Sequence, residues 1–287
     1  MTAVMLVLLL TRPGTDQGDK NYQPPVPVVM PAPPFDGFRA DSGMVDIDTV
    51  RLALVSAAPN DITDEQEWFE RNGLALPEYE VANPFRGTYG NLPGGTPEWY
   101  GDDMLVRAIA RDGGFFLVYG ADFGSGRWLA LADERMRLRR VFDFGAYVYS
   151  PRDVPADRDF IAQAITWAAA SDDVLYVSHR HRTYAASSGG LNGYITAIDL
   201  RDNRVLWRSR PLVCNTANFE VSGDVIFCGY GFTDEDDYVY VLNRFTGEEV
   251  QRTRVKTGPD YCVSKGDNLY VRCYDTDYVF RIEPVGR

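Results

Sequence analysis

The only two histidines of the chain are the first residues whose type and spacing suggest chemistry. His179 and His181 stand two positions apart in a run that reads as a β-strand, so both side chains would point to the same face. Two imidazoles on one face can hold a metal ion when a carboxylate or thiolate completes the set. No third ligand is identifiable, and Arg180 and Arg182 flank the pair. We therefore favour a polar strand end hydrogen-bonded to its loop, and we predict no metal and no cofactor.

Two acidic loops are the next candidates, at Asp234–Asp237 and at Asp275–Asp277. Clustered carboxylates can bind Ca²⁺ or provide the acid and base of a glycosidase. Neither loop has the glycine-punctuated spacing of a calcium loop, and solvated acidic loops are common. The sequence contains no Ser-His-Asp order, no phosphate-cradling glycine loop and no Cys-x-x-Cys pair. We predict no catalytic residue.

These residues belong to a strand pattern that recurs between Val174 and Glu283. Its strands are Val174–Val177, Gly193–Asp199 and Arg204–Arg208, then Asp224–Cys228, Tyr238–Asn243 and Glu249–Thr253, then Asn268–Arg272 and Tyr278–Ile282. A degenerate copy lies between Leu105 and Phe144. One such unit cannot bury its own face, so the copies are expected to stack into a ring. The sequence predicts an all-β protein, a β-propeller with four visible blades, and Tyr79 to Tyr100 is the candidate for a fifth.

Two further elements are expected in the N-terminal part of this domain. Val45 to Val55 reads as one strand, and because the last copy lacks its outer strand, this segment is the candidate to complete the last blade. Thr63–Gln66 has capping-box spacing, followed by Trp68 and then Gly73 where a helix would stop. We predict one short helix there.

Short motifs within the copies resemble the repeat of the pyrroloquinoline-quinone (PQQ)-type propellers. The matching stretches, from roughly residue 104 to 283, are clearest at Leu175–Val177, Tyr194–Asp199, Val205–Trp207, Thr246-Gly247 and Asn268–Val271. Such motifs identify architecture more than function. The quinoprotein dehydrogenases of this family have longer rings, adjacent cysteines and a calcium or lanthanide site, and this chain is too short and has no adjacent cysteines. The resemblance implies the non-enzymatic branch, which includes the outer-membrane-protein assembly lipoprotein.

Charge and the N-terminal residues restrict the class of partner and the compartment. A formal net charge of -12 over 287 residues repels phosphate backbones, so we expect no nucleic acid. Residues 2–10 are apolar like the core of a secretion signal, but a membrane span needs about 20 such residues. Prolines between Gln23 and Pro34 favour an extended spacer. We expect residues 1–37 to be a signal-like start and linker, and residues 38–287 to form a periplasmic or secreted propeller that associates with membranes only through its N-terminal segment.

The four cysteines all lie in the last third of the chain. An even number suits an oxidising compartment. If Asp267-Asn268 forms a two-residue turn, Cys262 faces Cys273 across a hairpin at the separation that a disulfide requires. The positions of Cys214 and Cys228 in their blade make a second disulfide plausible without fixing its register. The alternative is four buried free thiols in a cytosolic protein.

Loops that follow the second strand of each blade are expected to project from one rim and to carry recognition. They span residues 184–193, 229–237 and 274–277. We expect seven residues to border the binding surface: His179, His181, Tyr184, Asn192, Tyr230, Asp236 and Asp275. The leading hypothesis is a non-enzymatic binding or scaffold module for a protein or other macromolecule of the cell envelope. The alternative is a hydrolase or lyase that acts on carbohydrate with loop carboxylates.

Overall fold

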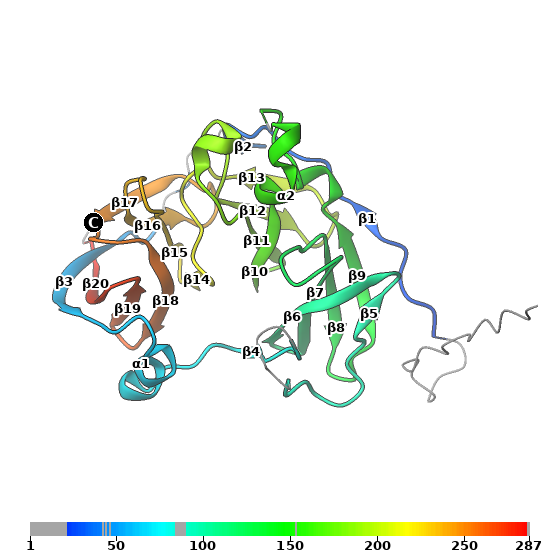
Figure 1. Ribbon diagram of the computed structural model, residues 1–287, viewed down its shortest axis with the longest axis horizontal. Helices are drawn as coiled ribbons and strands as arrows, with labels where there is room; N and C mark the ends of the chain where they lie inside the picture. The colour runs from blue at the N-terminus through cyan, green and yellow to red at the C-terminus, as the bar shows by residue number, and fades with distance from the viewer. Residues whose placement is uncertain are drawn as a thin grey trace, which may run out of the picture.

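The computed structural model describes residues 22–41, 43, 45, 47–83, 90–152 and 154–285. Strands dominate this part of the chain and form four separate sheets (Figure 1). The sheets are the four blades of a β-propeller, so the predicted fold class is confirmed. The apolar start at residues 2–10 lies outside the described residues. None of the helices described is long and apolar enough to cross a membrane.

Each blade is built around four antiparallel strands that follow one another from the centre of the ring outward. Blade 1 contains β6 (Asp103–Arg111), β7 (Gly114–Gly120), β8 (Trp128–Asp133) and β9 (Leu138–Asp143). Blade 2 contains β10 (Ala164–Ser171), β11 (Val174–Arg180), β12 (Tyr194–Asp199) and β13 (Val205–Arg208). The inner strands β6 and β10 contact each other across the blade boundary (Figure 1).

The other two blades repeat this order. Blade 3 contains β14 (Glu220–Ser222), β15 (Val225–Tyr230), β16 (Tyr238–Asn243) and β17 (Glu249–Arg254). Blade 4 contains β18 (Pro259–Lys265), β19 (Asn268–Cys273), β20 (Thr276–Pro284) and, as its outermost strand, β3 (Val50–Pro59). The second strands β11 and β15 are buried along nearly their whole length, because neighbouring blades cover both faces of each sheet.

Contact between blades 2 and 3 explains two of the repeat motifs. Trp207 is fully buried and its indole Nε1 donates a hydrogen bond of 3.0 Å to the carbonyl oxygen of Arg244 in the next blade. The ring of Trp207 packs directly on Gly247, which has a left-handed φ of 72° and no room for a side chain. The Val-Leu-Trp strand of one blade therefore docks on the Thr-Gly turn of the following blade.

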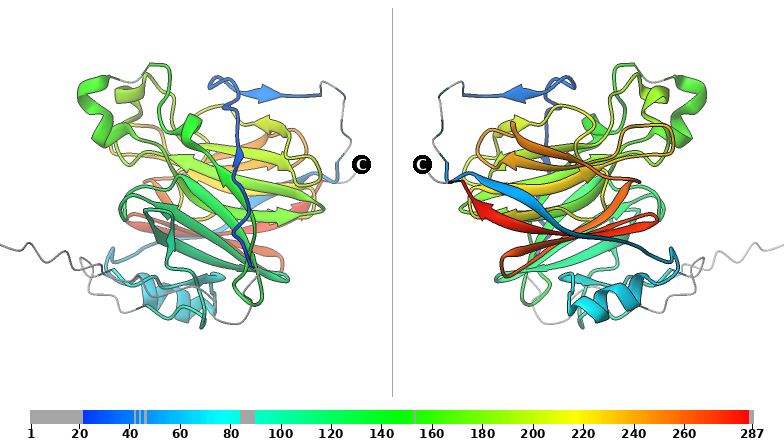
Figure 2. Two further views of the ribbon diagram at one scale, coloured as in Figure 1. Left: turned by 90° about the vertical axis from the view of Figure 1, so that its right-hand side faces the viewer. Right: turned by 90° about the vertical axis from the view of Figure 1, so that its left-hand side faces the viewer.

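The N-terminal part of the chain runs along the outside of the ring before it closes blade 4. β1 (Val28–Val29) pairs in parallel with β9, and β2 (Phe38–Arg39) pairs antiparallel with β13. β3 then pairs with β20 over its whole length, which confirms the predicted closure by an N-terminal strand (Figure 2). The strand begins five residues later than expected.

The proline-rich stretch from Gln23 to Pro34 was expected to be a spacer outside the domain. The structure corrects this for the described residues: Met30 is fully buried, and its backbone N–H donates a 2.9 Å hydrogen bond to the carbonyl of Asp143. Extended, proline-rich chain suits the outer edge of a blade, where only one side of the backbone needs partners. The signal-like start that was predicted within residues 1–37 stays a prediction.

Helix α1 (Glu65–Asn72) lies at the junction of the last and first blades, and the chain after it crosses to blade 1 (Figure 1). Gly73 ends the helix with a left-handed φ of 59°, as predicted. The N-cap is Asp64, one residue after the predicted Thr63. A second, four-residue helix, α2 (Arg158–Ile161), was not predicted.

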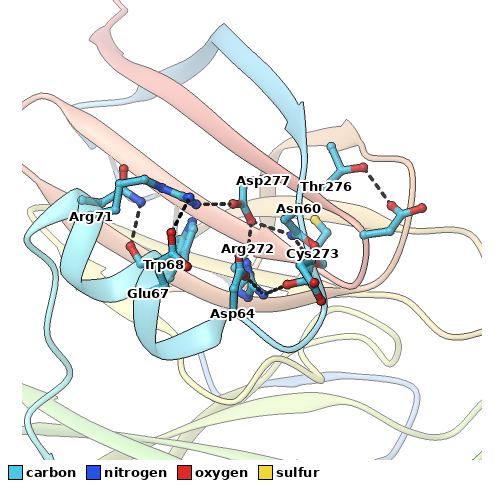
Figure 3. A network of polar contacts seen from close by, with 12 residues as sticks. Asn60, Asp64, Glu67, Trp68, Arg71, Arg272, Cys273, Thr276 and Asp277 are labelled. Atoms are coloured by element: carbon cyan, nitrogen blue, oxygen red, sulfur yellow. Dashed lines mark hydrogen bonds and ion pairs between the residues drawn. The ribbon is translucent and has the colours of Figure 1, made fainter.

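Buried ion pairs fasten α1 to blade 4 (Figure 3). The Arg272 guanidinium is 4% exposed and contacts Asp64 at 2.6 Å and Asp277 at 3.1 Å. It also donates a 2.7 Å hydrogen bond to the carbonyl of Asp61. Arg71 on the helix reaches the second oxygen of Asp277 at 3.3 Å. One buried arginine therefore holds the start of the helix and a strand of blade 4 together.

The described residues between 79 and 100, which exclude 84–89, do not form a fifth blade. β4 (Glu78–Tyr79) and β5 (Trp99–Tyr100) both pair with β6, so in the described residues this segment extends blade 1. Strands of two residues leave no periodic pattern in the sequence, so their placement could not be predicted.

The hairpin between β18 and β19 corrects the predicted cysteine register. Lys265 pairs with Asn268, so Cys262 stands opposite Val271, and Cys273 stands opposite Pro259. The reason is that Gly266, with a left-handed φ of 58°, forms the turn one residue earlier than predicted. All four thiols are buried and unpaired. The Cys214 and Cys228 side chains lie within hydrogen-bonding reach of each other, and a disulfide between them stays a prediction.

Candidate functional site: the loop rim and the central cavity

One end of the propeller carries the long loops, and we call it the loop rim. It consists of the turns after the second strands, at residues 121–127, 181–193, 231–237 and 274–275, together with the connection 144–163. These segments share one end because the second strands of all blades run in the same direction in equivalent antiparallel sheets. The connection that carries α2 projects from this end (Figure 2).

Three residues expected at the binding surface are instead core residues. His179 and Asn192 are each 1% exposed, and Tyr230 is 2% exposed. Asn192 holds the loop, since its side-chain oxygen accepts the backbone N–H of His181 at 2.9 Å. Tyr230 packs against Gly193 and donates its hydroxyl to the Glu235 carboxylate. The polar atoms of Asn192 and Tyr230 bind the loop itself, so these two residues position the rim.

His181 is also buried, and its ring Nε2 lies 2.9 Å from the Ser188 hydroxyl. Burial lowers the pKa of His181 to about 4, so the ring is neutral at physiological pH. Among the described residues, no group of three His, Cys, Asp or Glu side chains lies close enough together to hold a metal ion. This ring therefore closes the loop against its own short 3₁₀ turn at Ala185–Ser188.

The remaining predicted residues are on the surface. Tyr184 is 39% exposed and packs edge-on against Phe232 from the next blade at 5.0 Å between ring centres. Asp236 pairs with Arg254 at 3.0 Å, and Asp275 pairs with Lys256 at 2.8 Å. The acidic loops are thus partly neutralised by neighbouring bases, which leaves the aromatic side chains as the distinctive feature of the rim.

Further exposed aromatic side chains stand at the same end of the blades. Phe160 is 68% exposed in α2 and Tyr274 is 59% exposed in the turn before β20, and the others are Trp99 and Tyr149. Phe160 was not predicted as a site residue; its only signal in the sequence is an aromatic side chain between Asp159 and Ile161 in a polar connection. Of the exposed aromatics in the described chain, only Phe245 lies on the opposite rim.

Two adjoining cavities open near the ring centre on the same side. The smaller has a volume of about 310 Å³ and lies between blades 1 and 2, and the larger has a volume of about 610 Å³ and reaches α1. Both are lined by Val106, Arg107, Phe123 and Arg182. We call the two together the central cavity.

The two parts of the central cavity differ in charge. Arg107 and Arg182 line both parts, Arg180 lines only the smaller part, and Glu65, Glu78 and Glu80 line only the larger part. Arg107 and Glu78 form an ion pair of 2.5 Å between them. Burial raises the pKa of Glu78 above its usual range, although Arg107 opposes this shift. Glu65 accepts the hydroxyl hydrogen of Tyr261, so it too is held in place.

His179 gives a prediction on acid stability. Its ring lies 4.9 Å from that of Phe144 and 4.8 Å from that of Tyr147, and among the described residues neither ring nitrogen has a partner. Burial, and then the charge of Arg208, hold the pKa of His179 well below its usual value of 6.5. Below about pH 6.5 the unfolded chain therefore binds a proton that the folded chain does not bind, and stability is lost as the pH falls. We expect His179→Phe to raise the Tm, and to raise it more at pH 5 than at pH 8.

Thermal unfolding of both proteins at the two pH values measures this difference. The conservative replacement His179→Gln keeps polar atoms but has no titrating ring. This variant should lack the part of the pH dependence of stability that His179 causes, but it should not show the higher Tm expected of His179→Phe. An equal Tm difference between wild type and His179→Phe at both pH values would contradict the buried, neutral state of the ring.

Comparisons with known proteins identify no family. No family model matches the chain, and no curated protein matches it. Among solved structures, the computationally designed Ika4 protein matches with a TM-score of 0.39 and 9% identity over 62% of this chain and 89% of that one. BamB from Moraxella catarrhalis matches with a TM-score of 0.26 and 12% identity over 80% and 100% of the two chains. Glutaminyl cyclase from Myxococcus xanthus matches with a TM-score of 0.38 and 12% identity over 83% and 99%. We take no functional argument from matches at these scores.

Proposed function

We propose that the protein is a non-enzymatic binding propeller that recognises a protein partner through its loop rim. The observation that carries this proposal is the distribution of exposed aromatic side chains in the described part of the chain. Five of them lie at the loop rim and only Phe245 lies at the other; the five are Trp99, Tyr149, Phe160, Tyr184 and Tyr274. Tyrosines and other aromatics provide most of the binding energy in protein interfaces, while paired charges at the edge add little. The ion-paired acids Asp236 and Asp275 would form that polar edge.

The family and the compartment are part of the same proposal. The contact of Trp207 with the Gly247 turn supports a PQQ-type repeat, because it gives the two motifs one physical role. The apolar residues 2–10 support an extracytoplasmic location. A partner in the cell envelope follows from that location. The N-terminal segment would provide the only membrane association.

Substitution of rim aromatics tests the proposal. The double variant Tyr184→Ser/Tyr274→Ser should capture its partner at least about tenfold more weakly, because removing an aromatic anchor costs about 2 kcal/mol or more. Both side chains are exposed, so we expect the Tm to stay within about 2 °C of wild type. The measurement is capture by the tagged protein from an envelope fraction of its source cells, compared band by band.

Phe245→Ser is the matched control. Phe245 is 40% exposed, against 39% for Tyr184, but lies on the opposite rim. It should capture the partner as wild type does. Loss of capture in the Phe245 variant with full capture by the rim variant would place the binding face on the other side of the ring and would overturn the proposal.

A second candidate function is a carbohydrate hydrolase or lyase that uses the larger part of the central cavity. The observation in its favour is the pair Glu65 and Glu78 in one cavity, with the pKa of Glu78 raised by burial as a general acid requires. If the wild-type protein releases reducing ends from polysaccharides and the Glu78→Gln variant does not, the result favours this enzyme. Release unchanged by that substitution would exclude it.

A further inference from the structure

The smaller part of the central cavity gathers positive charge in a protein that is acidic overall. The chain has 29 basic and 41 acidic residues, yet the charged residues that line this part are Arg107, Arg180 and Arg182 against Asp159 alone. Arg107 comes from blade 1 and the other two from the end of β11 and its loop in blade 2. Bringing like charges together is unfavourable unless an anion is placed among them.

Arg180 is the centre of this arrangement. Among the described residues no hydrogen bond or ion pair engages its guanidinium, and its Nε is buried without a partner. Buried polar groups are almost always hydrogen-bonded, so an unmatched guanidinium beside a cavity marks a position for an absent acceptor. Burial, followed by the charge of Arg182, lowers the pKa of Arg180 to about 10, and the negative charge of Asp260 only partly offsets this. At physiological pH the group remains charged.

Arg107 is fixed in place by other contacts. Its Nη1 contacts Glu78 at 2.5 Å, and its guanidinium lies 5.8 Å from the ring centre of Trp167. This leaves Arg180 as the side chain with unused donors, and Arg107 as a rigid charge beside it. A planar guanidinium with free donors matches the two oxygens of a carboxylate or phosphate.

We propose that Arg180, with Arg182 and Arg107, binds an oxyanion, a carboxylate or a phosphate group, in the smaller part of the central cavity. This inference rests on the proposed function, in which the ligand is the acidic side chain of a partner bound at the loop rim. A cavity of about 310 Å³ accepts one such group and its waters but not a large ligand. The neighbouring carboxylates Glu65, Glu78 and Glu80 repel an anion, so they confine it to the arginine side.

Isothermal titration of the full-length protein tests the site with three probes: inorganic phosphate, citrate and a hexaglutamate peptide, at constant ionic strength. We expect saturable binding, weakened at least about tenfold by Arg180→Gln, because a charge-assisted bidentate contact contributes 1.4 kcal/mol or more. Tighter binding of hexaglutamate than of the two small anions identifies an acidic chain as the source, and the reverse order identifies a free anion. Either order supports the oxyanion site.

Arg135→Gln is the matched control, because Arg135 is exposed in the turn between β8 and β9 on the opposite rim. It should bind the probes within about twofold of wild type, as a distant, screened charge does. Arg182→Gln provides a second variant at an exposed position should Arg180→Gln unfold. Absence of saturable binding by all three probes, or equal weakening by Arg135→Gln, would overturn the inference.

Partner capture separates this inference from the proposed function. If wild type binds none of the probes but the Arg180→Gln variant captures the partner fully, the oxyanion site is excluded and the rim proposal stands. If probe binding depends on Arg180 but the rim variants capture the partner as well as wild type does, the oxyanion site stands and the rim proposal is excluded.

Discussion

Replacing Arg272 with alanine is expected to lower the free energy of unfolding by about 3–5 kcal/mol, the usual cost of breaking a buried ion pair from one side. Its guanidinium is 4% exposed and is shared by Asp64 and Asp277, so its loss leaves both carboxylates with fewer partners in a poorly hydrated place (Figure 3). Asp64 belongs to the N-cap of α1, whereas Asp277 belongs to β20. The cost should therefore appear both as lower global stability and as faster amide exchange in α1.

Urea unfolding followed by circular dichroism measures the global part. Arg281→Ala is the matched control, since Arg281 lies in the same sheet opposite Asn268 and is exposed. That substitution should change the free energy by no more than about 0.5 kcal/mol. A cost for Arg272→Ala below about 1 kcal/mol, the range of surface ion pairs, would show that the pair is solvated and that α1 is held by other contacts.

Replacing Arg208 with alanine should also be costly, at about 3 kcal/mol, for a different physical reason. Arg208 is buried, and no carboxylate of the described residues pairs with it. Its guanidinium carbon lies 4.4 Å from the centre of the Tyr147 ring, 4.5 Å from that of Phe35 and 4.8 Å from that of Tyr194. Cation–π contacts are worth about 2 kcal/mol when desolvated, and truncation of a large buried side chain adds a cavity. Burial lowers the pKa of Arg208 to about 10, so the cation persists at neutral pH.

Methionine at this position separates charge from packing. Arg208 also donates a 3.0 Å hydrogen bond to the carbonyl of Pro33 and so holds the N-terminal segment against blade 2. Arg208→Met restores most of the volume without the charge, and we expect it to cost less than Arg208→Ala but still to expose residues 31–36 to limited proteolysis. A methionine variant as stable and as protease-resistant as wild type would assign the role of Arg208 to packing alone.

The blades could be predicted because short apolar strands recur in the same order along the chain, and because Trp207 and Gly247 stand at positions that match motifs of the repeat. The closing strand could also be predicted, since an unpaired outer edge at the C-terminus requires a partner. The path of residues 22–37 could not, because prolines and two-residue strands have no periodicity. One left-handed glycine, Gly266, moved a turn by one residue and removed the basis for the predicted pairing of Cys262 with Cys273.

Only part of the candidate site could be predicted from the sequence, because the rest depends on contacts that leave no periodic pattern. The rim could be located from loop length, but burial of Tyr230 and Asn192 depends on how the loop folds back over its own blade. The arginine group of the central cavity joins Arg107 to Arg180, which are 73 positions apart, so their proximity depends on blade 1 packing against blade 2. Contacts between blades of this kind carry no local pattern.

Hydrogen exchange of the protein with and without its captured partner tests the central claim most directly, because it reads both rims at once. We predict protection of the loop-rim segments 144–163, 181–193 and 274–275, and unchanged exchange in the turns 200–204 and 244–248 at the opposite end. Protection confined to those opposite turns, with the loop rim unchanged, would contradict the account.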